Sequence, residues 1–179
     1  LISIANQGRL KDPLILKQQI NRMLADSRAE SLATGFASQW LRLLGIEDRA
    51  PESLLFPDFT KQLGTSMRRE IELLFEDIVR NDRNVLDLLT AEDTFMDDTL
   101  ARHYGVSDVI GTGFKRVQLT DQHRFGLIGK AGILTLTSFA NRTSPVTRGK
   151  YVLEVLLGLS PPQPPPAVPP LEEQMDNAR

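Results

Sequence analysis

The two histidines, His103 and His123, are the side chains best suited to act as a base or as a metal ligand. They lie twenty residues apart, with no cysteine nearby and no second histidine one helical turn away. A zinc site draws on several closely spaced histidines or cysteines, so this pair is a poor zinc signature. For each histidine we favour a structural role. For His103 that role is packing at a helix C-terminus, where the helix dipole favours positive charge.

Acidic residues gather between Glu92 and Asp98 and form a second candidate site. A pair of carboxylates can exchange protons with a substrate, and two of them across a cleft would suit a hydrolase or lyase acting on an extracellular polymer. Capping explains the same residues, because an aspartate at a helix start accepts hydrogen bonds from free backbone N–H groups. We favour capping by Asp97.

Basic side chains surround an expected helix start at Ser144-Pro145. Arg142 precedes it, and Arg148 and Lys150 follow. Free N–H groups and guanidinium groups together can bind a carboxylate or a phosphate. The favoured alternative is that Arg142 and Arg148 pair with carboxylates of the domain and hold its last helix in place. Ser144 lacks the G-x-S-x-G context of a nucleophile.

The composition of the 179 residues bounds the function. With 41% hydrophobic and 25% charged residues, the chain can form one globular domain, or one domain with a small appendage. A net charge of −2 argues against a nucleic-acid partner, and no apolar run approaches a membrane span. The absence of cysteine excludes disulfides, thiolate metal sites and covalent haem attachment in this chain. Without an initiator Met, the chain is interpreted as a piece of a longer protein.

Apolar periodicity and capping residues predict the helices that would position these groups. The aromatic residues Phe36, Trp40 and Tyr104 are expected in the core. Residues 114–119 alternate as a short extended segment, whereas 127–137 fit either a strand or a helix. The expected helices cover 13–24, 27–44, 60–81, 97–104 and 145–157, with a short helical turn at 85–89. Their expected N-terminal caps are Asp12, Asp26 or Ser27, Thr60, Asp97 and Ser144.

These elements predict a mainly α fold of about five to seven helices, with room for one short extended pair. We expect a helical domain over 1–125 and a C-terminal subdomain over 126–160, packed on it through the capped helix 145–157. Residues 161–179 are expected to form a proline-rich tail in the polyproline II conformation.

Several segments, taken together, resemble a known family over nearly the whole chain. They are Phe36-Ala-Ser-Gln-Trp40-Leu, Leu55-Phe-Pro-Asp58-Phe, Met67-Arg-Arg-Glu70, Thr94-Phe95, Leu100-Ala-Arg-His103-Tyr-Gly105, Phe114-Lys-Arg-Val117, Gly132-Ile-Leu-Thr135, Arg142-Thr-Ser-Pro145-Val-Thr-Arg148-Gly-Lys and Pro164-Pro-Pro-Ala-Val168-Pro. The order of these segments and their residues are similar to those of two consecutive domains of unknown function. These domains occur in large exported proteins of planctomycetes and acidobacteria, often beside planctomycete-type cytochrome c modules.

The resemblance implies a haem protein outside the cytoplasm, with its Cys-x-x-Cys-His motif beyond Arg179. His103 or His123 could then supply an axial ligand, and Arg142 or Arg148 could hold haem propionates. Haem c is therefore expected in the parent protein, and none is bound covalently by this chain. The implied partners are other domains of the parent and a redox partner.

Three functions are weighed on these grounds. The first is a helical module that supports electron transfer or oxidoreductase activity in a c-type-cytochrome-associated protein. The second is a non-catalytic scaffold, which a fully solvated charged face on the 60–81 helix would favour. The third is the polymer-acting hydrolase or lyase, which capping at Asp97 would exclude. The sequence declares no reaction of its own.

Overall fold

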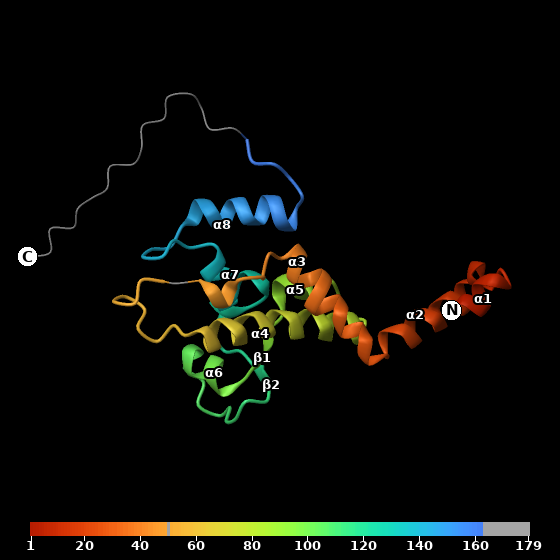
Figure 1. The fold of residues 1–179 in the computed structure, drawn as a ribbon, viewed down its shortest axis with the longest axis horizontal. Helices are drawn as coiled ribbons and strands as arrows, with labels where there is room; N and C mark the ends of the chain where they lie inside the picture. The colour runs from red at the N-terminus through yellow and green to blue at the C-terminus, as the bar shows by residue number, and fades with distance from the viewer. Residues whose placement is uncertain (50, 163–179) are drawn as a thin grey trace, which may run out of the picture.

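The computed structural model describes residues 1–49 and 51–162 and begins with a helical arm. Helices α1 (Ile2–Asn6) and α2 (Pro13–Leu24) extend away from the body (Figure 1). The carboxylate of Asp12 accepts the backbone N–H of Leu14 at 2.9 Å, so this cap is confirmed. Neither helix contains a buried residue, and the apolar side chains of Leu14, Leu16, Ile20 and Met23 in α2 are exposed.

The next helical segment begins at the predicted cap Asp26 but ends earlier than predicted. It is a 3₁₀ turn (Ser27–Glu30), a π-helical stretch (Leu32–Ala37) and α3 (Ser38–Trp40). The chain leaves the helix at Arg42, whose φ of 54° is left-handed, so the predicted end at 44 is wrong by about one turn.

The prediction that Phe36 lies in the core is also wrong, because its side chain is 57% exposed. The segment turns the small residues Ala33 and Ala37 toward the core instead. Phe36 stacks on Trp40, with ring centroids 5.9 Å apart. Trp40 is half-buried, and its Nε1 donates to the carbonyl of Val155 at 2.8 Å.

Helix α4 (Lys61–Arg80) runs through the middle of the body (Figure 1). Its cap is the predicted one, because the hydroxyl of Thr60 accepts the N–H of Leu63 at 3.1 Å. The apolar stripe of α4 is buried and contributes Leu63, Met67, Ile71, Leu74, Phe75 and Ile78 to the core. The helix is therefore the element against which the rest of the body packs.

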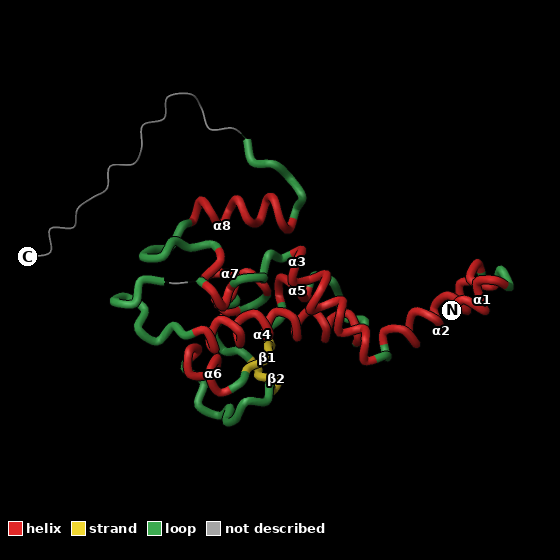
Figure 2. The backbone as a smooth tube through the Cα atoms, viewed as in Figure 1, coloured by secondary structure: helices red, strands yellow, loops and turns green. Residues whose placement is uncertain are grey.

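Two short helices and two short strands follow. They are α5 (Asp87–Thr90), β1 (Asp93–Met96), α6 (Asp98–Tyr104) and β2 (Lys115–Gln118). The two strands lie side by side (Figure 2). They pair antiparallel, with Asp93 opposite Gln118 and Met96 opposite Lys115. The expected extended pair is thus confirmed, and part of the acidic stretch forms its first strand.

The C-terminal elements pack on the same core. Residues 127–137 form a 3₁₀ turn (Leu127–Gly129) and helix α7 (Ala131–Leu136), which resolves the ambiguity between strand and helix. Helix α8 (Pro145–Tyr151) begins at its predicted cap Ser144 and continues as a π-helical turn (Val152–Leu156).

The fold is mainly α, as predicted, and no helix in the described part of the chain is long and apolar enough to cross a membrane. The buried hydrophobic side chains form one cluster, whose members lie between Ala33 and Val155 in the sequence. The division at 125/126 stays a prediction. Most of the expected polyproline tail, from 163 onward, lies outside the described residues.

Candidate functional site

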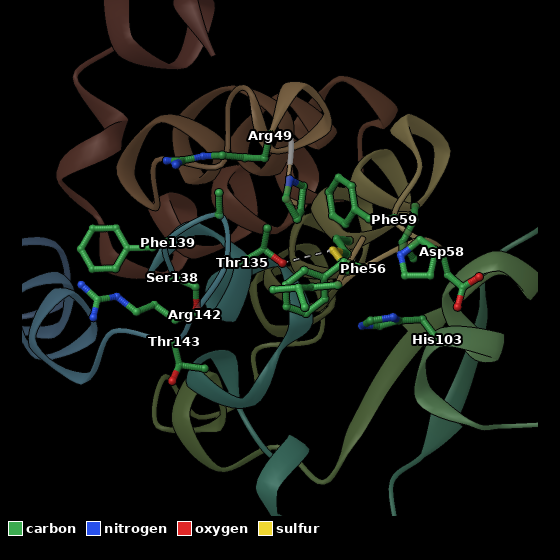
Figure 3. A pocket seen from close by; sticks show the side chains of 16 residues that line it. Arg49, Phe56, Asp58, Phe59, His103, Thr135, Ser138, Phe139, Arg142 and Thr143 are labelled. Carbon is green, nitrogen blue, oxygen red and sulfur yellow. Dashed lines mark hydrogen bonds between the residues drawn. The ribbon is translucent and has the colours of Figure 1, made fainter. Parts of the chain in front are cut away.

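A cavity of about 470 Å³ opens between the loop before α4 and the helices α4, α6 and α7 (Figure 3). Its volume falls within the range of about 300–1,000 Å³ that is typical of small-molecule sites. The loop that joins α7 to α8 closes the remaining side. The cavity therefore collects residues from three separate stretches of the chain, at 49–67, at 103 and at 135–143.

The walls of the cavity are mainly apolar. Phe56 and Phe59 come from the loop before α4, Leu63 and Met67 from α4, and Phe139 from the loop after α7. The hydroxyl of Thr135 donates to the sulfur of Met67 at 3.8 Å, which links α7 to α4 at the floor. An apolar lining of this kind favours the burial of an apolar group.

Backbone hydrogen bonds hold the two wall-forming loops together. The N–H of Glu52 donates to the carbonyl of Ala140 at 2.9 Å. Within the second loop, the N–H of Phe139 donates to the carbonyl of Arg142, also at 2.9 Å. These bonds fix the loop that carries Arg49 beside the loop that carries Arg142.

Charged side chains lie at two ends of the cavity. Arg49, Phe139 and Arg142 lie on one side of Figure 3, and His103 and Asp58 lie on the other. The guanidinium of Arg142 lies over the ring of Phe139, 5.2 Å from its centroid. We call the Arg49, Phe139 and Arg142 side the arginine end.

His103 lies in the last turn of α6, at the predicted helix C-terminus, and it also lines the cavity, which the sequence did not predict. His103 is exposed as a residue, and partial burial of its ring, together with the positive charge of Arg124, lowers its pKa, while Asp58 opposes them. The imidazole is thus biased toward its neutral form, which can accept a hydrogen bond or ligate a metal.

The other two predicted residues lie elsewhere. His123 is exposed in a 3₁₀ turn (Gln122–Arg124) and does not line the cavity. Arg148 is half-buried, and its Nε donates to the hydroxyl of Thr137 at 3.4 Å, which ties α8 to α7. The four residues proposed from the sequence therefore separate into His103 and Arg142 at the cavity, and His123 and Arg148 away from it.

The predicted pairing of Arg142 and Arg148 with carboxylates is not found. Within residues 1–49 and 51–162, neither side chain forms an ion pair. The physical reason is that the loop from 138 to 143 turns Arg142 toward Phe139 and the cavity instead.

The acidic stretch is structural. Asp97 caps α6 by accepting the N–H of Leu100 at 2.9 Å, and its other oxygen accepts the hydroxyl of Ser66 at 2.7 Å. Asp93 pairs with Arg83 at 3.1 Å and with Arg116 at 2.8 Å. These contacts occupy both carboxylates, so the observation on which the hydrolase or lyase alternative rested is removed.

A buried polar network that the sequence analysis did not find lies next to the cavity. Glu70 of α4 is fully buried and accepts the hydroxyls of Thr94 at 2.7 Å and Tyr104 at 2.9 Å. The Tyr104 hydroxyl in turn accepts the N–H of Ala131 at 2.8 Å. Lys130 is also fully buried, and its ammonium donates to the carbonyl of Arg124 at 3.1 Å.

Burial sets the protonation of this network. It raises the pKa of Glu70 to about 6, against the opposing effects of Lys130 and the two hydroxyl donors. It also lowers the pKa of Lys130 and raises that of Tyr104. One signal could have located Glu70, because it lies three residues after Met67 and four before Leu74, on the apolar stripe of its helix.

Two family models match the chain. Residues 1–106 match the model PSD4, described as "Protein of unknown function (DUF1592)". Residues 124–179 match the model PSCyt3, described as "Protein of unknown function (DUF1588)". Comparison with curated proteins and with solved structures gave no match.

Proposed function

We propose, from the premise that the chain belongs to the DUF1592 family of proteins of unknown function, that it is a helical module supporting electron transfer in a larger exported protein. DUF1592 followed by DUF1588 is the cytochrome c-associated planctomycete pair that the sequence resembles. The proposal places the haem-bearing segment and its attachment motif outside residues 1–179.

The observation that carries the proposal is the cavity in which His103 and Arg142 meet apolar walls. Haem combines an apolar ring with carboxylate substituents and an iron that accepts imidazole. The donor set of the cavity suits such a group, because a neutral imidazole, guanidinium groups and aromatic walls are all present. With no cysteine in the chain, the cavity would receive a haem held by another segment.

Four residues of the cavity have a role in this proposal. Arg142 binds a propionate, and Phe56 and Phe59 exclude water from the ring. His103 lies at the opposite end, where its neutral imidazole can contact the iron or a polar edge of the group. When bound, the haem supplies one-electron transfer, and the protein environment adjusts its reduction potential.

The test is a comparison of His103→Ala with the matched control His123→Ala in the full-length parent protein. We expect His103→Ala to shift the Soret band or the reduction potential, because of the two histidines only His103 lines the cavity. His123→Ala should leave both unchanged. Identical spectra and potentials for the wild type and both variants would eliminate the histidine role.

Helix α4, whose charged face was to test the scaffold alternative, gives that alternative little support. Its criterion was a solvated charged face on α4, far from any pocket. Instead Glu72 on that face is buried, and Arg68 pairs with Glu47 at 3.0 Å. Helix α4 also lines the cavity through Leu63 and Met67. A binding function therefore ranks above a purely structural one.

A further inference from the structure

We infer that the arginine end of the cavity binds the carboxylate of an apolar ligand, with Arg49 and Arg142 as its two contacts. The inference rests on the proposed function only in taking the cavity as a binding site. It adds Arg49, which the sequence analysis did not single out, and it states the chemical class of the ligand.

The first support is the charge left at this end. Every arginine of α4 has a carboxylate partner: Arg68 pairs with Glu47, Arg69 with Glu30 and Arg80 with Glu76. In the described part of the chain, neither Arg49 nor Arg142 forms an ion pair. Two guanidinium groups thus border an apolar cavity with their charge available to a ligand.

The second support is that the backbone holds both arginines on one side. Ser138 and Thr143 form an isolated antiparallel bridge, which closes the turn that carries Phe139 and Arg142. The bond from the Glu52 N–H to the Ala140 carbonyl fixes the segment after Arg49 against this turn. Figure 3 shows both guanidinium groups on the same side as Phe139. The ring of Phe139 restricts the Arg142 side chain, since the guanidinium lies over it.

The third support is the polarity of the cavity along its length. Its apolar walls separate the arginine end from His103 and Asp58 at the opposite end. A ligand with an apolar body and one anionic end would place its carboxylate between the arginines, where charge-assisted bidentate hydrogen bonds form. A cationic ligand would meet two positive charges there. A propionate-bearing porphyrin edge and a free aliphatic carboxylate share the required chemistry.

The experiment measures binding of dodecanoate and dodecanol to the 179-residue chain by calorimetry near neutral pH. Both probes are kept below the solubility limit of dodecanol and below the concentration at which dodecanoate forms micelles. The two probes differ only in the anionic group. We expect dodecanoate to bind about 10-fold more tightly or better. Arg49→Gln and Arg142→Gln should each weaken dodecanoate by about 10-fold and leave dodecanol unchanged.

Arg148→Gln is the matched control, because it removes a guanidinium that does not line the cavity. It should leave both affinities unchanged. Arg49 and Arg142 are exposed, so their variants should fold, which a thermal melt by circular dichroism verifies. A dodecanol affinity equal to that of dodecanoate would overturn the inference. So would an unchanged dodecanoate affinity in Arg49→Gln and Arg142→Gln, alone or combined in one chain.

A second pair of probes separates the two sources of the carboxylate. If propionates occupy the arginine end, iron protoporphyrin IX should bind more tightly than its dimethyl ester. If a free aliphatic carboxylate occupies it, dodecanoate should bind more tightly than dodecanol, and the porphyrin and its ester should bind equally. The failure of each proposal is distinguishable. Equal affinities for dodecanoate and dodecanol would refute carboxylate binding at the arginine end and would not affect the His103 test in the parent protein. Unchanged haem spectra and potentials in that test would refute the haem proposal and would not affect the carboxylate inference.

Discussion

The cavity and the buried Glu70 network lie one helical turn apart on the same two helices, yet their charged side chains differ in whether the fold supplies partners for them. On α4, Met67 faces the cavity and Glu70 the network; on α7, Thr135 faces the cavity and Ala131 begins the network. In the network, both oxygens of Glu70 have hydroxyl donors within the fold. At the cavity, the arginines have no carboxylate partner among the described residues.

The difference follows from solvent access. A carboxylate removed from water is tolerated only where the fold supplies donors and a counter-charge, so the Glu70 network acts on stability. A guanidinium at an open rim keeps its hydration and needs no partner in the fold, so it remains available to a ligand. Substitutions in the two regions should therefore separate stability from binding.

The largest expected effect is that of Glu70→Ala on folding. The change leaves the hydroxyls of Thr94 and Tyr104 without their acceptor and removes the larger of the two negative charges, Glu70 and Asp93, that favour the charged form of the buried Lys130. We expect a loss of about 3–5 kcal/mol in the free energy of unfolding. Urea denaturation followed by circular dichroism measures it.

Arg142→Ala is the comparison from the cavity and should change the free energy of unfolding by less than about 0.5 kcal/mol. Similar losses for Glu70→Ala and Arg142→Ala would show that the two regions do not differ in the way we describe.

The next effect in size is the pH dependence that Glu70 should give to the free energy of unfolding. Because burial raises its pKa from the ordinary 4.5 to about 6, the folded state holds this proton more tightly than the unfolded state. The resulting stabilisation is fully present below about pH 4.5 and is lost as the pH rises through about 6. The difference between the two pKa values corresponds to roughly 2 kcal/mol.

The measurement is the unfolding free energy of the wild type minus that of Glu70→Gln across this pH range. Other carboxylates titrate in both proteins and cancel in the difference. The difference should fall as the pH rises, and a flat curve would refute the assigned pKa.

The smallest expected effect is on the protonation of His103 at the cavity. The positive charge of Arg124 lowers the pKa of this histidine after burial does, and Asp58 raises it. Arg124→Gln should therefore raise the pKa, and Asp58→Asn should lower it further. Titration of the imidazole by NMR measures both shifts. His123 does not line the cavity and serves as the internal control for Asp58→Asn, but not for Arg124→Gln, because it adjoins Arg124 in the chain. Shifts in the reverse directions would contradict the electrostatic account of the site.

Local hydrogen bonds explain why much of the fold was predictable. Asp12, Thr60, Asp97 and Ser144 each cap a helix by accepting a backbone N–H two or three residues ahead. Such a bond depends on neighbouring residues alone, so the sequence indicates it directly. The family resemblance was equally visible, since it rests on the order of short segments, and the family matches confirm it.

The composition of the site depended on contacts between distant segments. Only the packing of α6 near the loop after α7 brings His103 and Arg142 to one cavity and leaves His123 and Arg148 outside it. The burial of Glu70 likewise requires hydroxyls from β1 and α6. Sequence by itself thus determined the helices, their caps and the family. Tertiary structure decided which charges are satisfied within the fold and which face a ligand, because that depends on groups brought together from separate elements.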